Sequence, residues 1–348
     1  MRYFLKRIVY GIGVIIAIVI LVTAIIFLAP VDPAQLTFGQ RAETSTVENK
    51  RKELGLDKPL YIQLGMYLSD ISPINLIDKS SSRLSKYSYN KLLNLGSKSL
   101  ILKKPYLRES YQSGRAVSSI LAEAIPKTIL LAFFAILLAT IIGISLGVIA
   151  SLKQNSFTDN IAVVCSVIGY SLPSYVTAIL LALVFGYLLG DITGLNVQGS
   201  IIELDEFGDK KLVLKNIILP AIALGIRPVA IITLLTRSAM LDVMSMDFIR
   251  TAKAKGISRF KLLFKHALRN AMNPVATAIT GWFAALLAGA FFVENVFNFK
   301  GLGDITVTAL QQFDIPVVLG AVLFTAITFV IVNILVDVVY RWLDPRVT

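Results

Sequence analysis

Long apolar runs separated by polar segments dominate the pattern of this chain. Five runs without a charged residue reach the roughly 20 residues that cross the hydrocarbon core of a bilayer. They are residues 8–29, 128–152, 161–190, 271–293 and 315–336. A sixth apolar run, residues 216–236, is interrupted by Arg227. The pattern therefore predicts an all-α integral membrane protein with six transmembrane helices.

Composition supports the same class of protein. The 348 residues are 55% hydrophobic and only 16% charged, and the mean hydropathy is +0.73. A soluble domain of this size could not bury so much apolar surface. The first run follows basic residues as a signal peptide does, but it is longer than a usual signal core and has no A-x-A-like exit, so we expect it to be retained.

Net charge is +12, which in a soluble protein would suggest nucleic acid as a partner. Here the short basic flanks account for most of it. Residues 241–270 hold seven Lys or Arg residues and two Asp residues, and further basic residues flank the other runs at Arg2, Lys6, Arg7, Lys153, Arg341 and Arg346. If six spans alternate from a cytoplasmic N-terminus, all of these lie in the cytoplasm, with residues 31–117, 191–215 and 298–314 outside. Segment 31–117 is basic too, but a loop of this length translocates regardless of its charge.

The polar pattern divides the chain into three parts. We expect an N-terminal transmembrane helix (1–30), an extracytoplasmic region (31–117) and a five-helix core (118–348) that includes a loop at 241–273. Within the extracytoplasmic region, residues 54–71 suit a short amphipathic helix, whereas the stretch near 72–111 suggests a small lid or a partly ordered insertion. The single cysteine, Cys165, excludes a disulfide within the chain.

Helix breakers occur inside several apolar runs. Close helix packing explains most of the glycines, such as Gly143 and Gly147. The segment YSLPSY at residues 170–175 differs, because it groups polar and aromatic side chains around a break at mid-membrane depth. Its candidate pathway residues are Tyr170, Ser171, Pro173 and Tyr175.

Arg227 is the charged residue inside an apolar run. A charge at the bilayer centre costs at least about 2.5 kcal/mol and usually faces a partner or water. One interpretation, which we favour, is structural: Arg227 lies near the end of a tilted span beside Pro228, or pairs with Glu294. The other is a cationic group that attracts a peptide carboxylate along a pathway.

The most informative stretch is residues 247–274, which is basic and amphipathic. RTAKAKG (250–256) predicts a short helix closed by Gly256 in the left-handed conformation, and Ser258 offers an N-cap for a second helix. The apolar stripe Phe260, Leu263, Phe264, Ala267, Leu268 and Ala271 predicts the buried face of that helix. Lys261, Lys265 and Arg269 on its other edge would suit either binding to anionic lipid or docking on a partner, but a lipid-bound helix needs no such capped turn.

This loop resembles the coupling helix of ABC importer permeases, which seats on an ATPase subunit. The family motif begins Glu-Ala-Ala and ends Leu-Pro, whereas this chain has Arg250-Thr251-Ala252 and Leu268-Arg269 at those places. The resemblance to the peptide (oligopeptide, dipeptide and nickel) branch extends to MRYFLKRI at the start, LAPVDP (28–33), LGLDKPL (54–60), LTRSAMLDVMSMDFIRTAKAKG (235–256), HALRNAMNPV (266–275), VENVFNFKGLG (293–303) and LVDVVYRWLDPR (335–346).

That resemblance implies the type I ABC importer permease fold in a bacterial cytoplasmic membrane. It implies four kinds of partner: a second homologous permease, two ATP-binding subunits, an extracytoplasmic substrate-binding protein and a peptide substrate. The coupling residues it implies are Asp247, Arg250, Thr251, Ala252, Lys253, Ala254, Lys255, Gly256, Ile257 and Ser258. Glu294, in the VENVF motif near the outer mouth, either orients the adjacent outer loop or contacts substrate.

The sequence carries no motif for catalysis. It lacks a G-x-x-x-x-G-K-[ST] phosphate loop, a nucleophile motif and any His, Cys and carboxylate cluster at metal-ligand spacing. The lone His266 is expected on a surface. We therefore expect no cofactor and no enzyme activity in this chain, with ATP and Mg bound by partner subunits, and no nucleic acid partner.

Three alternatives stay open at this stage. The first is a permease for nickel or a metal chelate within the same family, although the absence of His from the apolar runs argues against bare metal. The second is an ion-coupled carrier acting alone, which would be expected to hold a buried acidic relay that the spans lack. The third is a structural or receptor-like membrane protein, which would not need breaks in several helices.

Overall fold

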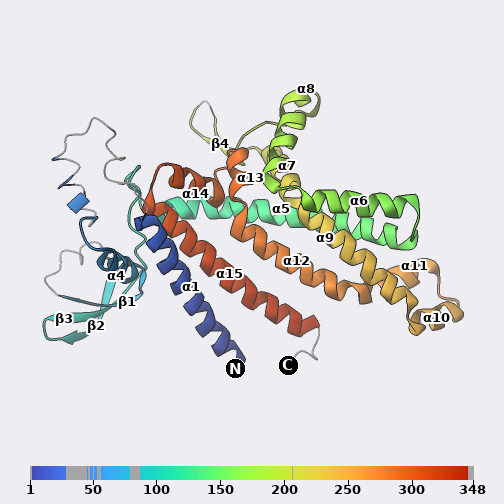
Figure 1. Ribbon diagram of the computed structural model, residues 1–348, viewed down its shortest axis with the longest axis horizontal. Helices are drawn as coiled ribbons and strands as arrows, with labels where there is room; N and C mark the ends of the chain where they lie inside the picture. The colour runs from blue at the N-terminus through green and yellow to red at the C-terminus, as the bar shows by residue number, and fades with distance from the viewer. Residues whose placement is uncertain are drawn as a thin grey trace. The chain divides into compact units, whose positions relative to one another are not determined.

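The computed structural model describes residues 2–28, 56–78, 87–205 and 207–343, with a few further positions between 45 and 52 (Figure 1). The longer helices are α1 (Arg2–Leu28), α4 (Leu60–Ile71), α5 (Val117–Leu152), α6 (Phe157–Ser171), α9 (Ile218–Ser245), α12 (Arg269–Gly289), α14 (Leu302–Gln311) and α15 (Ile315–Leu343). The short helices are α7 (Ser174–Leu181), η2 (Ala182–Leu188), α8 (Gly190–Thr193), η3 (Leu214–Ile217), α10 (Asp247–Ala254), α11 (Arg259–Lys261), η4 (Leu262–Leu268) and α13 (Phe291–Val296). Residues 29–33 of the LAPVDP motif lie outside the described residues.

The predicted class needs one correction, because the chain is not all-α. A three-stranded antiparallel sheet follows α4, with strands β1 (Ile74–Asp78), β2 (Tyr89–Leu95) and β3 (Lys98–Lys103) in the order β1-β3-β2. A second, two-stranded hairpin joins β4 (Ile202–Leu204) to β5 (Lys210–Leu212). Both lie in segments where the sequence shows no regular hydrophobic period, so the strands could not be predicted.

Among the described residues, four helices are long and apolar enough to cross a membrane: α1, α5, α9 together with η3, and α15. A fifth span results if the bent pair of α6 with α7 and η2 counts as one. The predicted apolar run 271–293 forms α12, which does not join this group. The structure thus supports four or five of the six predicted spans.

The run 161–190 forms two helices bent by 104°. The bend lies at Leu172 and Pro173, whose ψ angles of 131° and 136° are extended. Proline has no N–H to continue the helix, and its ring disfavours helical backbone in the residue before it. The break predicted from YSLPSY is therefore present, and it divides this run more sharply than a single kinked span would.

The chain divides into two compact units. One consists of Ala124–Ile305 and Ile327–Thr348. Its helix α9 packs against α6, α7 and α12. Small residues of α5 allow a close approach to α9, because a Cβ on Gly143 would lie 2.7 Å from Ile232 Cγ2 and one on Gly147 would lie 2.5 Å from Thr236 Cβ. These two glycines have the packing role expected from the sequence.

The other unit consists of Met1–Glu123 and Thr306–Ala326. The predicted short helix in residues 54–71 is confirmed as α4, whose Tyr67 joins a buried cluster with Val19 of α1 and Ile315 and Leu319 of α15. Asp314, just before α15, accepts hydrogen bonds from Ser110 Oγ (2.5 Å) and from the backbone N–H of Tyr111 (3.0 Å). The polar segment after α4 is therefore tied to the start of α15.

Candidate functional site

The predicted helix, turn, helix in the basic loop is present. Helix α10 ends at Ala254, and Gly256 has φ +74°, the left-handed conformation that the sequence predicts. The N–H of Ile257 donates to the carbonyl of Ala252 (3.3 Å) and that of Gly256 to the carbonyl of Lys253 (3.0 Å). This pair of bonds is a Schellman motif, which closes the helix and satisfies two of its last carbonyl groups.

Helix α10 has one buried and one exposed face. Ile249 and Ala252 are buried against Met240 and Val243 of α9 and against η4. The other side is exposed and carries the remaining predicted coupling residues Asp247, Arg250, Thr251, Lys253, Ala254 and Lys255. Asp247 and Arg250 form an exposed ion pair at 3.4 Å. The buried face fixes α10 on the end of α9, so the exposed face is presented on a rigid support.

Two local predictions in the following helix are confirmed only in part. Ser258 occupies the N-cap position of α11, but its side chain makes no capping hydrogen bond. The predicted buried stripe is confirmed at Ala267 and Ala271, which are buried, and Leu263 and Leu268 are partly buried against the same cluster. It is wrong at Phe260 and Phe264, which are 70% and 49% exposed, and Leu262 is buried instead. Residues 262–268 form a π-helix, whose wider turn changes the spacing of the buried positions, so Phe260 and Phe264 do not continue the stripe of Ala267 and Ala271.

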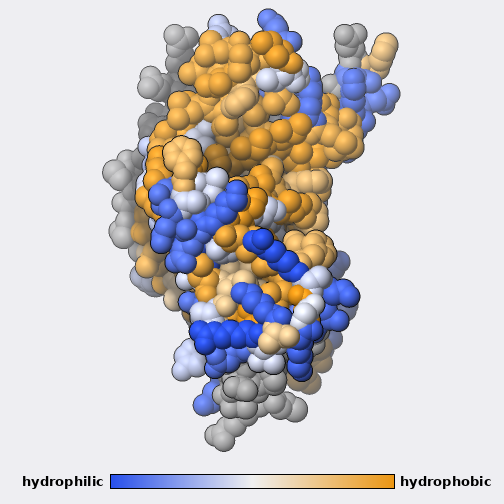
Figure 2. All heavy atoms as spheres, turned by 90° about the vertical axis from the view of Figure 1, so that its right-hand side faces the viewer, coloured by the Kyte–Doolittle hydropathy of each residue, from blue (hydrophilic) through white to orange (hydrophobic). Residues whose placement is uncertain are grey.

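Phe260 and Phe264 form an exposed aromatic pair, with ring centroids 4.6 Å apart. Basic residues surround this pair in the sequence, namely Arg259, Lys261 and Lys265. Figure 2 faces the α10 and α11 end and shows hydrophilic residues gathered there with apolar ones between them. This end offers both charge and apolar area for contact with another molecule.

Two of the candidate pathway residues meet at the helix break. The Arg227 guanidinium lies over the ring of Tyr170, 5.3 Å from its centroid. Arg227 Nε is buried and has no hydrogen-bond partner among the described residues, and no ion pair joins Arg227 to Glu294 there. A guanidinium with an unused donor beside an aromatic ring can still bind an anionic group.

The remaining residues of the break are exposed. Ser171 Oγ donates to the carbonyl of Val167 (2.8 Å), one turn back in α6. Pro173 and Tyr175 are exposed, and the Tyr175 ring lies 6.4 Å from the ring of Phe292 on α13. The helix break therefore lies beside α13, the helix that carries Glu294.

Glu294 is fully buried and lies at a junction of three helices. Its Oε1 accepts a hydrogen bond from Thr128 Oγ1 of α5 (2.7 Å), and its Oε2 accepts from the N–H groups of Gly303 (2.7 Å) and Asp304 (3.3 Å) at the start of α14. Burial raises the pKa of Glu294 to about 7, although these three hydrogen bonds oppose the rise. Of the two roles expected for Glu294, this geometry favours orienting the adjacent loop, because the carboxylate accepts hydrogen bonds from Gly303 and Asp304.

Glycines near Glu294 allow this packing. A Cβ on Gly303 would lie 2.5 Å from Phe291 Cα, so a larger residue would displace α13 or α14. The loop before β4 also packs here, because the N–H of Gly199 donates to the carbonyl of Phe297 (2.9 Å) and Ser200 Oγ donates to that of Phe299 (2.8 Å). Two loops predicted to lie outside are thus joined to each other.

An ion pair that involves a buried carboxylate was missed at the sequence level. Arg237 of α9 donates from Nε to Asp159 Oδ1 (2.5 Å) and from Nη2 to Asp159 Oδ2 (2.7 Å). Asp159 is 1% exposed and also accepts from the N–H of Asn155 (2.9 Å). The sequence did carry an indication of this pair. Asp159 comes just before the apolar run 161–190 and Arg237 just after the run 216–236, which places both at a similar depth if the spans alternate in direction.

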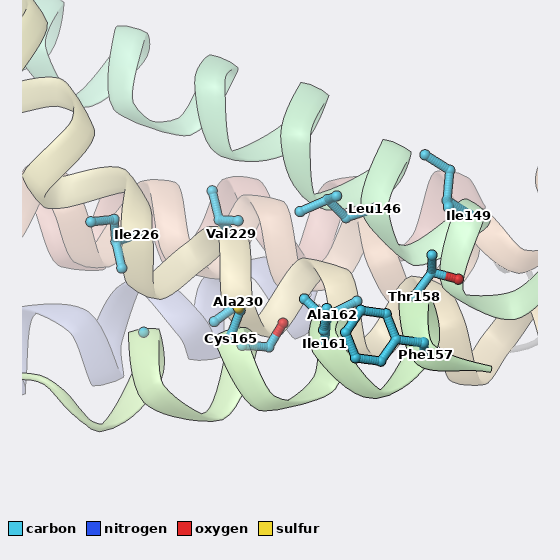
Figure 3. Close-up of a pocket in the computed structure, with 12 residues that line it drawn as sticks. Leu146, Ile149, Phe157, Thr158, Ile161, Ala162, Cys165, Ile226, Val229 and Ala230 are labelled. Carbon is cyan, nitrogen blue, oxygen red and sulfur yellow. The ribbon is translucent and has the colours of Figure 1, made fainter. Parts of the chain in front are cut away.

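An apolar groove lies between α5, α6 and α9 (Figure 3). Its volume is about 470 Å³, and residues such as Leu146, Ile161, Cys165 and Val229 line it. Gly169 and Ile226 at one end precede Tyr170 and Arg227 in the chain, but none of the pathway candidates lines the groove. A peptide backbone would find few hydrogen-bond partners there, so the groove does not suit a peptide.

Comparison with family models gives two matches that together cover nearly the whole chain. The model for the "binding-protein-dependent transport system inner membrane component" matches residues 139–348, and the corresponding N-terminal model matches residues 1–132. The chain belongs to this family of transport permeases. The resemblance seen in the sequence motifs is confirmed, and the family consists of transport proteins rather than enzymes.

Curated relatives match along their full length. The chain is 32% identical to the dipeptide transport system permease protein DppB of Alkalihalophilus pseudofirmus, covering 100% of this chain and 99% of the relative. It is 35% identical to a putative peptide transport system permease protein of Brucella abortus, covering 99% and 98%. It is 32% identical to the probable D,D-dipeptide transport system permease protein DdpB of Escherichia coli, covering 97% and 95%.

Among solved structures, the chain is similar to one of the MetNI methionine ABC transporter in inward-facing conformations, at a TM-score of 0.48 and 15% identity. The match covers 65% of this chain and 97% of that chain. The family assignment rests on the sequence matches.

Proposed function

We propose that this chain is the membrane-spanning permease subunit of an ATP-driven importer for oligopeptides or dipeptides. The observation that carries the proposal is end-to-end similarity to permeases named for peptide and dipeptide transport. Those names do not favour the alternative of nickel or a metal chelate. Among the described residues there is also no group of three His, Cys, Asp or Glu side chains that could hold a metal ion.

The proposed complex has the type I importer architecture. Six spans, counting α12, place both termini and the α10 loop in the cytoplasm of a bacterial plasma membrane. The partners are a second, homologous permease, two ATP-binding subunits that hold ATP and Mg, and an extracytoplasmic substrate-binding protein. The family is named for dependence on a binding protein, which supports the last of these partners.

Helix α10 and the turn at Gly256 are the proposed coupling element. The Schellman turn makes α10 and the following helix one rigid lever, and its exposed residues, with Ile257 and Ser258 at the turn, would seat on an ATPase subunit. Movement of this lever would rock the spans around a central pathway. In that pathway Tyr170 and Arg227 would contact the peptide, with Ser171, Pro173 and Tyr175 beside them, whereas Glu294 would act by holding the outer loop.

The proposal is tested by isolating the affinity-tagged chain from its native membrane. We expect ATP-binding subunits and a second permease to co-purify, and the reconstituted complex to take up labelled dipeptides or oligopeptides only with ATP and the binding protein. Uptake by the purified chain alone, driven by an ion gradient, would instead support the ion-coupled carrier. ATP-driven uptake of nickel but not of peptides would overturn the substrate class.

A further inference from the structure

The three-stranded sheet has one covered face and one bare face. Residues Ser99, Ile101 and Lys103 of β3 are buried. Lys103 Nζ donates to the carbonyl of Asp70 in α4 (2.5 Å) and lies 4.3 Å from the centre of the Tyr87 ring. Alternate residues in a strand point to opposite faces, so Leu100 and Leu102 belong to the other face.

The strand register defines the composition of that other face. Ile74 pairs with Leu102, Leu76 pairs with Leu100, and Leu100 also pairs with Leu93. Ile74, Leu76, Leu93 and Leu102 are 55%, 47%, 61% and 43% exposed. We call Ile74, Leu76, Leu93, Leu100 and Leu102 the apolar sheet face, and within the described residues nothing covers it.

Polarity changes along the strands. The last pair on the same face is Asp78 with Lys98, both exposed, at the end of the sheet farther from α4. The apolar pairs lie at the end next to α4, where Asn75 Nδ2 donates to the carbonyl of Ser69 (3.0 Å) and the N–H of Lys103 donates to the carbonyl of Pro73 (2.8 Å). Along β1 and β3 the face is thus aliphatic near α4 and charged at the far end, whereas β2 places the exposed Asn90 beside Leu102 on the same face.

The apolar end of the sheet is held close to membrane-spanning helices. Tyr67, Leu68 and Ile71 in the second half of α4 pack in one cluster with residues of the candidate spans of α1 and α15, among them Val19 and Leu319. Only two residues separate α4 from β1, so the first apolar pair, Ile74 with Leu102, lies close to α4. We infer that this pair is near the depth at which those spans leave the bilayer. The charged pair lies farther along the strands.

We propose that the apolar sheet face rests in the bilayer leaflet on the side of the C-terminal end of α1. Two successive pairs on one face cover about 7 Å along a strand, which matches the roughly 5–10 Å by which interfacial elements enter the headgroup and acyl boundary. The composition also fits lipid, because energetically dominant residues of protein interfaces are enriched in Trp, Tyr and Arg, whereas this face holds Leu and Ile. Asp78 and Lys98 would remain in water.

The experiment uses the full chain, in its complex, reconstituted in vesicles. Cys165, which is exposed, is first replaced by alanine, and a single environment-sensitive fluorophore is attached at Leu93→Cys or Asn94→Cys. These neighbours are both exposed, but Asn94 pairs with the buried Ser99 and so belongs to the opposite face. Vesicles with acyl chains brominated near the headgroup are compared with unbrominated vesicles.

The probe at residue 93 should lose emission in the brominated vesicles, whereas the probe at residue 94 should not. In a second series, quenching should decrease in the order Ile74→Cys, Leu76→Cys, Asp78→Cys, which keeps the test valid if one variant fails to fold. Equal quenching at residues 93 and 94, or none at either, would overturn the proposal. Protection of residue 93 from an aqueous quencher without quenching by bromolipid would also overturn it, because a protein would then cover the face.

Discussion

The buried Asp159 and the partly exposed Arg237 form an ion pair with two parallel hydrogen bonds between α6 and α9. Removing one partner of a fully buried pair costs about 3–5 kcal/mol, and the cost is smaller here because Arg237 is partly exposed. We therefore expect Arg237→Leu to lower the thermal unfolding midpoint of the purified chain markedly. The double variant Asp159→Asn with Arg237→Leu should recover part of the loss, and a single variant as stable as the parent would contradict this account.

Glu294 makes stability depend on pH. Its pKa is raised by burial to about 7 from an ordinary 4.5, so the stabilisation is present below the ordinary pKa and is lost as pH rises through about 7. Asp304 adds to the rise, and Lys300 and Lys127 lie near Asp304. The unfolding free energy of the parent, relative to Glu294→Gln, should fall by roughly 3 kcal/mol between about pH 5 and pH 8.

The role of Thr128 supplies the control for that measurement. Thr128 donates a hydrogen bond to Glu294, which favours the charged form of the carboxylate. Thr128→Val should therefore move the transition to higher pH. A parent whose stability relative to Glu294→Gln is the same across this range would show that Glu294 does not titrate there.

Replacing Arg227 separates its two interpretations, a structural role within the helices and contact with the transported peptide. If it contacts the peptide, Arg227→Leu should lower uptake about tenfold, the effect of losing roughly 1.4 kcal/mol, with unchanged yield of assembled complex. Arg227→Lys keeps the charge and should retain most of the uptake. Reduced yield with unchanged uptake per complex would assign Arg227 to structure and remove it from the pathway.

For single residues, the sequence predicts local backbone conformation better than it predicts contacts between helices. Gly256 could be predicted in the left-handed conformation because a helix end followed by glycine is a local signal. The pairing of Asp159 with Arg237 depends on how α6 and α9 pack, and the burial of Glu294 depends on α5 and α14. The positions of Asp159 and Arg237 at the ends of two apolar runs indicate a similar depth, but no short motif predicts either contact.

Among the elements, α10 presents exposed basic residues of the proposed coupling loop. Lys253 and Lys255 are exposed, and we expect them to face acidic or polar groups of an ATPase subunit. Lys253→Glu with Lys255→Glu should weaken association several-fold at low salt, since each exposed pair contributes about 0.2–1 kcal/mol, and added salt should reduce the difference. The matched control reverses Lys210 and Lys211 of β5, which are also exposed.

Equal effects of the two charge reversals on assembly would show that net charge, rather than the position of α10, governs the contact. Binding would be measured between detergent-solubilised permease and purified ATPase subunits over a series of salt concentrations. Only the α10 variant should show a changed salt dependence.

A helix or strand could be predicted where its hydrophobic residues recur at a regular spacing. The long apolar runs and α4 follow a simple hydrophobic pattern, and they form helices as predicted. The helix after Gly256 contains a π-helical segment, and the predicted stripe fails at Phe260 and Phe264, which are exposed, but holds at Ala267 and Ala271, which are buried. In the sheet β2 and β3 form a local hairpin, but β1 pairs with β3 20 or more residues along the chain, and the strands' aliphatic outer face hides the usual alternation.

For the whole molecule, the central claim is that the turn at Gly256 transmits ATP hydrolysis to transport. A side chain at φ +74° costs about 1–2 kcal/mol in backbone strain and would alter the angle between α10 and the next helix. Gly194 provides a matched control, because it has φ +66° at the end of α8 and, like Gly256, has open space around its Cα. Gly256→Val and Gly194→Val therefore impose similar strain at different places.

The deciding measurement compares ATP hydrolysis and peptide uptake in the same reconstituted complexes. With Gly256→Val, hydrolysis should continue while uptake and the response to the binding protein are lost, and with Gly194→Val the ratio of uptake to hydrolysis should match the parent. If complexes carrying Gly256→Val take up peptide and respond to the binding protein as the parent does, this loop is not the coupling element.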